Sequence, residues 1–159
     1  MKISFGMIFS IILIVIFIAF AFYGISKFLD YQKTIQIGQF TTYFQEDIDK
    51  MWRGSQGAVT AGPYTLPSKI EYVCFADFSK SSLGLNKEFY HDFQLVSSGG
   101  EKNMFFYPKE ASEGRSFKIN HLNIQNITKD ENPYCIETIK GKIEINIKKD
   151  LGENLVTIE

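Results

Sequence analysis

The chain has 159 residues, with 17 basic and 18 acidic side chains and a formal net charge of −1. This length allows one modest domain beside a membrane anchor. The balanced, unclustered charges argue against a nucleic-acid surface or a polybasic lipid-binding patch. The 15 Phe and 8 Tyr favour strands over helices in the part that follows the anchor.

The first feature along the chain is an uncharged stretch at residues 3–26, between Lys2 and Lys27. As a helix it would be about 36 Å long, enough to cross a hydrocarbon core of about 30 Å. It contains no proline and is apolar on all sides, as a helix in contact with the lipid bilayer must be. Because it is longer than the apolar core of a secretory signal, we expect a retained anchor.

Orientation is indicated by features of the later chain rather than by the anchor. The lysines that flank the span give almost no preference for either orientation under the positive-inside rule. Cys74 and Cys135 suggest one disulfide, with two unrelated buried thiols as the alternative. Asn126-Ile127-Thr128 is an acceptor sequence for glycosylation at Asn126. Both features favour a single-pass protein of the cell membrane with its C-terminal domain outside.

A helical pattern continues after the span to residue 52 and carries two apolar stripes. The lower stripe is Phe28, Tyr31 and Ile35, and the upper stripe is Ile37, Phe40, Phe44, Ile48 and Met51. At 100° per residue the two stripes lie on roughly opposite sides of one helix. The switch falls at residues 36–38, where Gly38 is the natural place for a bend.

The opposed stripes predict two different packing partners. The upper stripe most simply packs on the chain's own domain. The lower stripe, just outside the membrane, is expected either to contact a neighbouring subunit or to lie with Tyr23 in an aromatic belt at the lipid headgroups.

After the helix the sequence predicts a β-rich extracytoplasmic domain at residues 69–159. Glycines at 54 and 57 end the helical pattern, and the Gly- and Pro-rich residues 54–68 are typical of an extended loop. Strands are predicted at 69–78, 88–96, 102–107, 116–122, 134–139, 142–147 and 155–158. The first should be central and covered on both faces, and Lys140-Gly141 should form a hairpin turn. We therefore predict an α+β fold: a long N-terminal hydrophobic and amphipathic helix over 1–53, followed by an antiparallel β-meander as a sheet or small sandwich.

Candidate catalytic and metal-binding groups are few. His91 and His121 lie in separate predicted strands, and neither has a neighbour at the close spacing typical of zinc ligands. Asp130 and Glu131 fall in a turn, where solvated carboxylates are expected and calcium is the alternative. No nucleophile, phosphate-binding or metalloprotease motif occurs. We expect no enzyme activity, no cofactor and no metal.

In its order of elements the chain resembles a type IV pilin, especially the archaeal type. An apolar N-terminal helix, an amphipathic continuation, a glycine-rich loop, a β-meander and one disulfide carry the resemblance. The family's basic leader ends in Gly just before the apolar helix, so Gly6–Met7 is the matching processing site. Ile11 stands where the bacterial pattern has Glu. The resemblance implies that the anchor leaves the bilayer and becomes the apolar core of a helical filament, with the β domains outside.

Two hypotheses follow. The first is a structural filament subunit whose partner is itself, assembled through Phe28, Tyr31 and Ile35. The second is a single-pass membrane protein whose extracytoplasmic β domain binds a partner or supports a membrane complex.

Overall fold

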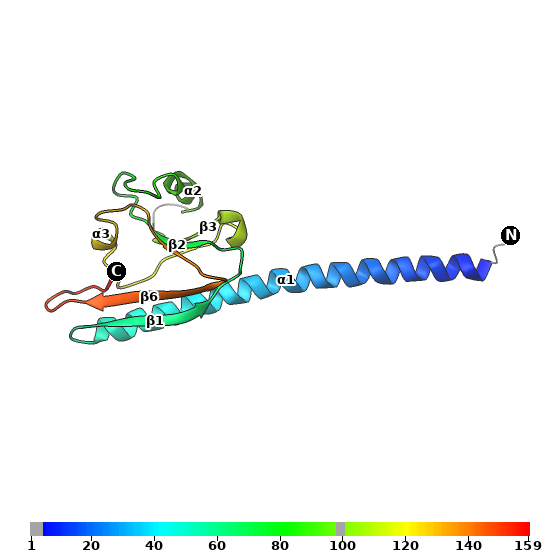
Figure 1. The fold of residues 1–159 in the computed structure, drawn as a ribbon, viewed down its shortest axis with the longest axis horizontal. Helices are drawn as coiled ribbons and strands as arrows, with labels where there is room; N and C mark the ends of the chain where they lie inside the picture. The colour runs from blue at the N-terminus through cyan, green and yellow to red at the C-terminus, as the bar shows by residue number, and fades with distance from the viewer. Residues whose placement is uncertain (1–4, 98–100) are drawn as a thin grey trace. The chain divides into compact units, whose positions relative to one another are not determined.

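The computed structural model describes residues 5–97 and 101–159 (Figure 1). A long N-terminal helix, α1 (Phe5–Arg53), precedes two antiparallel sheets, which confirms the predicted α+β class. The chain divides into two compact units, with the boundary between Ile35 and Gln36. This boundary falls where the two apolar stripes change sides.

The first unit contains the apolar part of α1. Its large apolar side chains from Met7 to Ile35 are exposed, and its helix is long and apolar enough to cross a membrane. The hydroxyls of Ser10 and Ser26 donate to the carbonyl oxygens of Gly6 and Phe22, each at 2.9 Å. These polar groups are therefore satisfied within the helix, as a lipid environment requires.

The second unit begins with the last part of α1, which forms one wall of the domain core. Ile37, Phe40, Phe44 and Ile48 are at most 2% exposed, and Met51 packs against the same cluster. The prediction that the upper stripe packs on the chain's own domain is confirmed. The helix continues through Gly38 without interruption.

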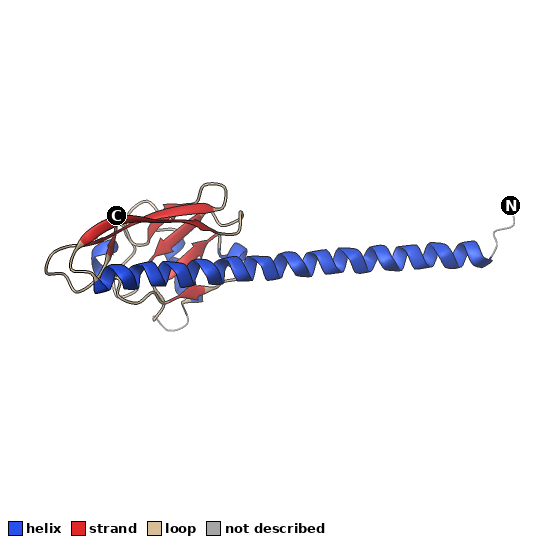
Figure 2. Ribbon diagram, turned by 90° about the horizontal axis from the view of Figure 1, so that it is seen from below, coloured by secondary structure: helices blue, strands red, loops and turns tan. Residues whose placement is uncertain are grey.

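Two sheets complete the domain (Figure 2). One has the order β1-β6-β7, formed by Gly57–Thr65, Lys142–Lys149 and Thr157–Ile158. The other has the order β4-β3-β2-β5, formed by Ser116–Phe117, Met104–Tyr107, Tyr72–Phe75 and Tyr134–Glu137. Both sheets contribute to the cluster that buries the upper stripe of α1.

The central position predicted for the first strand is confirmed by β2. It pairs with β3 on one side and with β5 on the other. Val73 and Phe75 pack in the core beneath α1, while Cys74 belongs to a second cluster on the opposite face. Both faces are therefore covered.

The predicted loop at 54–68 is wrong over most of its length, because Gly57–Thr65 forms β1. Its backbone pairs with β6 from Gly57 opposite Lys149 to Thr65 opposite Lys142. The register shifts between Ala61 and Tyr64, which accommodates the Gly62-Pro63 pair. Proline is tolerated at the edge of a sheet and at irregularities, so turn-like composition did not prevent a strand here.

The strand predicted at 88–96 is also wrong. Phe89–Val96 forms a helix, α2, that buries Phe89 and Phe93 at a spacing of four residues. Phe93 stacks on Phe105 of β3, with ring centroids 5.1 Å apart. Aromatic density favours a strand, but tertiary packing of one helical face decided the outcome.

The strand predicted at 116–122 survives only as the two residues of β4. It is followed by an irregular segment in which His121 has a positive φ of 64°. Two short helices that the sequence did not indicate lie nearby: η1 (Lys109–Ser112) and α3 (Ile124–Ile127).

The tight turn predicted at Lys140-Gly141 is confirmed. The residues on either side, Ile139 and Lys142, exchange two backbone hydrogen bonds of 2.8 and 3.0 Å. However, β5 before the turn and β6 after it belong to different sheets, so the domain is not one continuous meander. The alternation along β6 is as predicted, with Ile143, Ile145 and Ile147 at most 3% exposed.

Candidate functional site

The lower stripe of α1 is an exposed apolar surface that follows the span directly. Phe28, Tyr31 and Ile35 are 67%, 69% and 57% exposed. Their spacing confines them to roughly 60° of the helix circumference. Asp30 and Lys33 lie on another side of the same turns and pair with each other at 3.2 Å. The charged pair therefore lies away from the stripe, on a side of the helix that also carries the exposed Leu29.

An exposed apolar stripe of this kind provides a surface for packing against a partner rather than groups for catalysis. Burying apolar area against a partner contributes roughly 25 cal/mol per Å², so three large side chains can contribute several kcal/mol. Further toward the span, the ammonium group of Lys27 lies 5.8 Å from the ring centroid of Tyr23.

The predicted processing site lies in the first part of α1. Gly6 and Met7 are helical, and Met7 is 52% exposed. Ile11, at the position of the bacterial Glu, is 53% exposed on the same helix. Residues 1–4, which belong to the predicted leader, lie outside the described residues.

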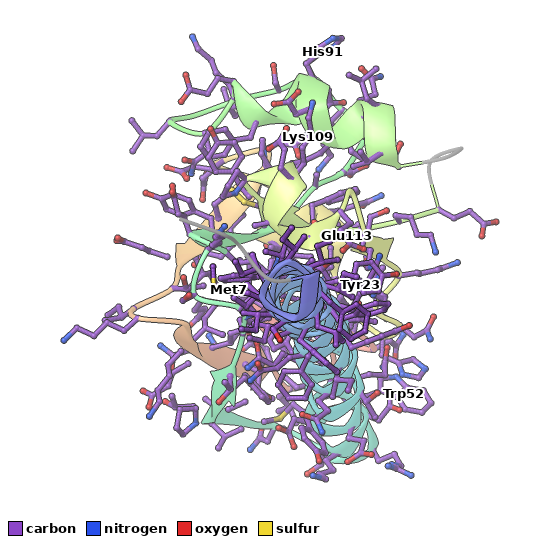
Figure 3. The ribbon with its side chains drawn as sticks, turned by 90° about the vertical axis from the view of Figure 1, so that its right-hand side faces the viewer. Met7, Tyr23, Trp52, His91, Lys109 and Glu113 are labelled. Atoms are coloured by element: carbon purple, nitrogen blue, oxygen red, sulfur yellow. A yellow bond between two sulfur atoms is a disulfide. The ribbon has the colours of Figure 1, made fainter. Side chains whose placement is uncertain are left out.

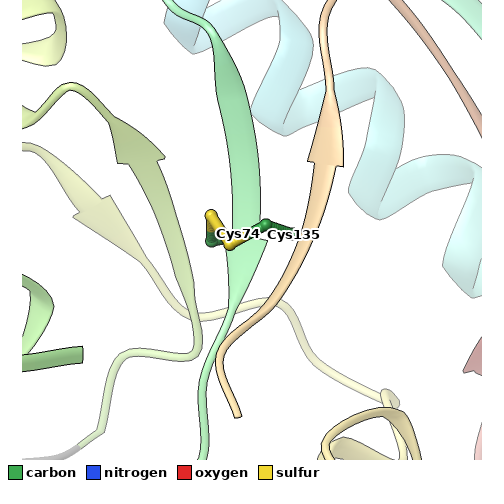
Figure 4. Close-up of a disulfide and its surroundings, with 2 residues drawn as sticks. All are labelled: Cys74 and Cys135. Atoms are coloured by element: carbon green, nitrogen blue, oxygen red, sulfur yellow. A yellow bond between two sulfur atoms is a disulfide. The ribbon is translucent and has the colours of Figure 1, made fainter. Parts of the chain in front are cut away.

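The predicted disulfide is present between Cys74 and Cys135 (Figure 4). The two residues lie directly opposite each other in the register of β2 and β5. Their separation of 61 residues makes the bond a covalent closure of a large part of the domain. The alternative of two unrelated buried thiols is thereby excluded.

The acceptor sequence for glycosylation lies in and just after α3. Asn126 is exposed, and its side-chain nitrogen donates to the hydroxyl of Thr157 at 3.3 Å. Thr128 is 2% exposed, and its hydroxyl donates to the carbonyl oxygen of Ile124 at 2.7 Å. The threonine hydroxyl of the acceptor sequence is thus used within the fold, and glycosylation at Asn126 stays a prediction.

The two histidines do not share a site. His91 lies exposed on α2, whereas His121 stacks on Trp52 near the end of α1. Figure 3 shows Trp52 and His91 at opposite ends of the view. Both cysteines are committed to the disulfide, which leaves no thiolate for zinc. Within residues 5–97 and 101–159, no group of three or more His, Cys, Asp or Glu side chains is placed to hold a metal ion.

One polar cluster on α1 was missed in the sequence. Gln45, Asp49 and Trp52 lie on one side of the helix, at spacings of four and three residues. The backbone N–H of Asn120 donates to the Gln45 side-chain oxygen at 2.8 Å. The Gln45 amide in turn donates to Asp49 Oδ1 at 2.8 Å.

The same cluster includes His121. Its Nδ1 lies 2.9 Å from Asp49 Oδ1, and its ring stacks on Trp52 with centroids 3.7 Å apart and planes 5° apart. The Trp52 indole N–H donates to the carbonyl oxygen of Asn154 at 3.0 Å. The helical spacing of Gln45, Asp49 and Trp52 could be recognised in the sequence. Nothing local in the sequence indicates that His121 contacts this side of the helix.

A second polar contact ties α1 to β1. The Tyr64 hydroxyl donates to Asp47 Oδ2 at 2.6 Å, and Lys50 Nζ donates to Oδ1 at 2.8 Å. Partial burial by itself would raise the pKa of Asp47, but the hydrogen bonds from Lys50 and Tyr64 outweigh it and hold the pKa below its ordinary value. Burial, and then the neighbouring carboxylate, raises the pKa of Tyr64. The stabilisation by Asp47 is therefore present at neutral pH and is lost as the pH falls through its lowered pKa.

Comparison with known proteins gives no match to this chain among family models, curated proteins or solved structures.

Proposed function

We propose that this chain is a structural subunit of an extracellular filament similar to a type IV pilus. The apolar helices of many copies would form the filament core, and the β domains would form the outer surface. In this proposal the partner is the chain itself, and the bilayer holds residues 3–26 before assembly.

The contrast between the two stripes of α1 carries the proposal. The upper stripe packs in the domain core, whereas Phe28, Tyr31 and Ile35 are exposed, with the ion pair of Asp30 and Lys33 on another side of the same turns. An amphipathic helix with an unburied apolar side associates with another apolar surface. A second copy of the chain carries the same stripe, so the two stripes can pack against each other. The apolar span of one copy can be covered by the spans of other copies as well as by lipid.

The second hypothesis rests on the span alone. A helix able to cross a membrane followed by a compact β domain also suits a single-pass protein that stays in the membrane and binds a partner or supports a complex. In that case the lower stripe would lie at the lipid headgroups.

The test is electron microscopy of material sheared from cells, together with N-terminal sequencing of this polypeptide. The filament hypothesis expects filaments that contain the chain, with a mature end at Met7. The membrane hypothesis expects intact Met1 and a chain confined to the detergent-soluble membrane fraction. The second pattern would contradict the proposal.

A substitution within the stripe tests its role directly. Phe28→Lys should abolish filaments while leaving the domain folded, because an unpaired charge in an apolar interface costs several kcal/mol. Thr34→Lys is the matched control, since it adds the same charge about a quarter-turn away from the stripe. Normal filaments with Phe28→Lys, or equal loss with Thr34→Lys, would count against assembly through this stripe.

A further inference from the structure

The free edge of β1 lacks the usual protection of a sheet edge. The two sheets end at β1, β5, β7 and β4, which have nine, four, two and two residues. Very short strands, charged side chains, proline and irregularities normally keep a sheet edge from pairing with another chain. β1 is long and contains no charged residue, and its proline and register shift fall after Ala61. Residues 57–61 are therefore a regular, uncharged edge.

Two residues of this edge direct their backbone groups away from the sheet. Thr60 lies opposite Asn146 of β6, and the carbonyl oxygen of Asn146 accepts from the backbone N–H of Glu159, on the other side of β6. Residues opposite each other in an antiparallel pair direct their backbone groups either both toward or both away from each other. The N–H and C=O of Thr60 therefore point away from β6, and so do those of Ala58, two residues earlier. In the described part of the chain, no strand lies beside these groups.

A hollow of about 440 Å³ lies along this edge, between β1 and the end of α1. Its apolar lining includes Met51, Val59 and Ile147, and Val59 is 51% exposed. The charged groups that line it, Asp47 and Lys50, are paired with each other at 2.8 Å. A strand added beside β1 would thus place an apolar side chain at the hollow without facing a net charge.

We propose that this edge pairs with β1 of a second copy of the chain, antiparallel about a twofold axis at Val59. In this register Ala58 lies opposite Thr60 of the second copy, and the symmetric pair repeats the contact. All the outward-directed backbone groups of both copies then form hydrogen bonds. The two Val59 side chains lie opposite each other beside the hollow. Like charges opposite each other would destabilise such a pair, and β1 has none to bring together.

The proposed pair joins copies of opposite orientation. Figure 1 shows β1 running back along the last part of α1: Tyr64 bonds to Asp47, and a Cβ at Gly57 would lie 3.9 Å from the Met51 sulfur. Because the two β1 strands are antiparallel, residues 36–53 of the two copies also run in opposite directions. This contact is therefore separate from the lower stripe and does not depend on assembly through it.

The test is disulfide formation by Val59→Cys in the full chain in detergent micelles, where Cys74 and Cys135 are already bonded to each other. Under mild oxidation this variant should give a covalent dimer on a non-reducing gel, because the two substituted positions face each other. Leu95→Cys is the matched control. It places a thiol at a residue of α2 that is 65% exposed, and it should stay monomeric.

Two further variants test the register and the independence of the contact. A mixture of Ala58→Cys and Thr60→Cys chains should form the mixed dimer in preference to either self-dimer. Phe28→Lys combined with Val59→Cys should dimerise as fully as Val59→Cys alone, whether or not the lower stripe assembles filaments.

A like charge placed on the axis should remove the pair. Sedimentation equilibrium of the Phe28→Lys chain in detergent should show a dimer that is lost when Val59→Lys is added. The proposal is overturned if Val59→Cys gives no more dimer than Leu95→Cys, or if Val59→Lys leaves the dimer intact. It is also overturned if oxidation of intact cells joins Val59→Cys to a different polypeptide instead of a second copy.

Discussion

At the scale of single residues, Lys149 secures the end of α1. Its ammonium group donates to the carbonyl oxygens of Trp52 and Gly54, at 2.5 and 2.8 Å. The last carbonyls of a helix have no partner within the helix and carry a partial negative charge. A cation reaching them from β6 therefore satisfies these groups and joins the helix end to the sheet.

Replacing Lys149 by Met should lower the free energy of unfolding by about 1 kcal/mol, because the aliphatic stem is kept and the charged donor is lost. Urea denaturation of the full chain in detergent measures this change. Lys148→Met is the control, since Lys148 pairs on the surface with Asp150 and Glu159. A change in Lys148→Met as large as that in Lys149→Met would contradict the capping role.

Contacts between residues close in sequence were partly predictable, whereas those formed by tertiary packing were not, apart from the disulfide. The upper stripe of α1 could be read because all its members lie on one helix and repeat with the helical period. The partners of Asp49 and Trp52 could not, because His121 lies about 70 residues away in an irregular segment. The disulfide was predictable because only two cysteines exist to form it.

At the scale of elements, Gly38 lowers the stability of α1, although the packing around it does not require a glycine. It lies within a continuous helix, and a Cβ added there would meet no atom within 4 Å. Glycine in a helix interior is destabilising because it loses more conformational freedom on folding than other residues.

Gly38→Ala should therefore raise the free energy of unfolding of the domain by about 0.5 to 1 kcal/mol. The same substitution at Gly62 should have the opposite effect. That residue has a φ of 113°, and a Cβ there would approach the carbonyl oxygen of Ile143 to 2.9 Å. Equilibrium unfolding of the two variants tests both signs, and a destabilised Gly38→Ala would contradict the open helical environment.

Elements were predicted correctly where the period of apolar residues in the sequence matches the side that the fold buries. They were predicted wrongly where the prediction rested on amino-acid composition alone. The alternation of β6 is strict, because one face is buried and the other is wet. The α2 segment holds three aromatics, which favoured a strand, yet Phe89 and Phe93 are buried on one helical side. At β1 the Gly and Pro residues indicated a loop. The segment forms a strand because it pairs with β6, and this long-range pairing cannot be inferred from local composition.

At the scale of the whole domain, the disulfide connects the central strand β2 to the edge strand β5 across a long stretch of chain. Cys74 is fully buried and packs in the cluster beneath α2, while the neighbouring residues of β2 face the main core. The bond restricts the unfolded chain more than it alters strand pairing, because the two cysteines are already opposite each other in register.

Replacing both cysteines by Ala should lower the free energy of unfolding by about 2 to 4 kcal/mol, the typical contribution of a disulfide. Alanine is preferable to serine, since a hydroxyl at the buried Cys74 position would lack a partner. Urea denaturation of this variant, compared with wild-type chain under reducing and oxidising conditions, gives the measurement. Equal stability of all three samples would show that the bond contributes nothing.

The main core places the beginning and end of the domain in one cluster. Ile37, near the start of the second unit, shares this cluster with Val156 and Ile158, at the end of the chain. During synthesis, the early residues of the domain core therefore become fully buried only after residues 156–158 have been added. A domain that lacks Val156 and Ile158 would leave the upper stripe of α1 without its full cover, so an exposed apolar helix side would mark an incompletely folded domain.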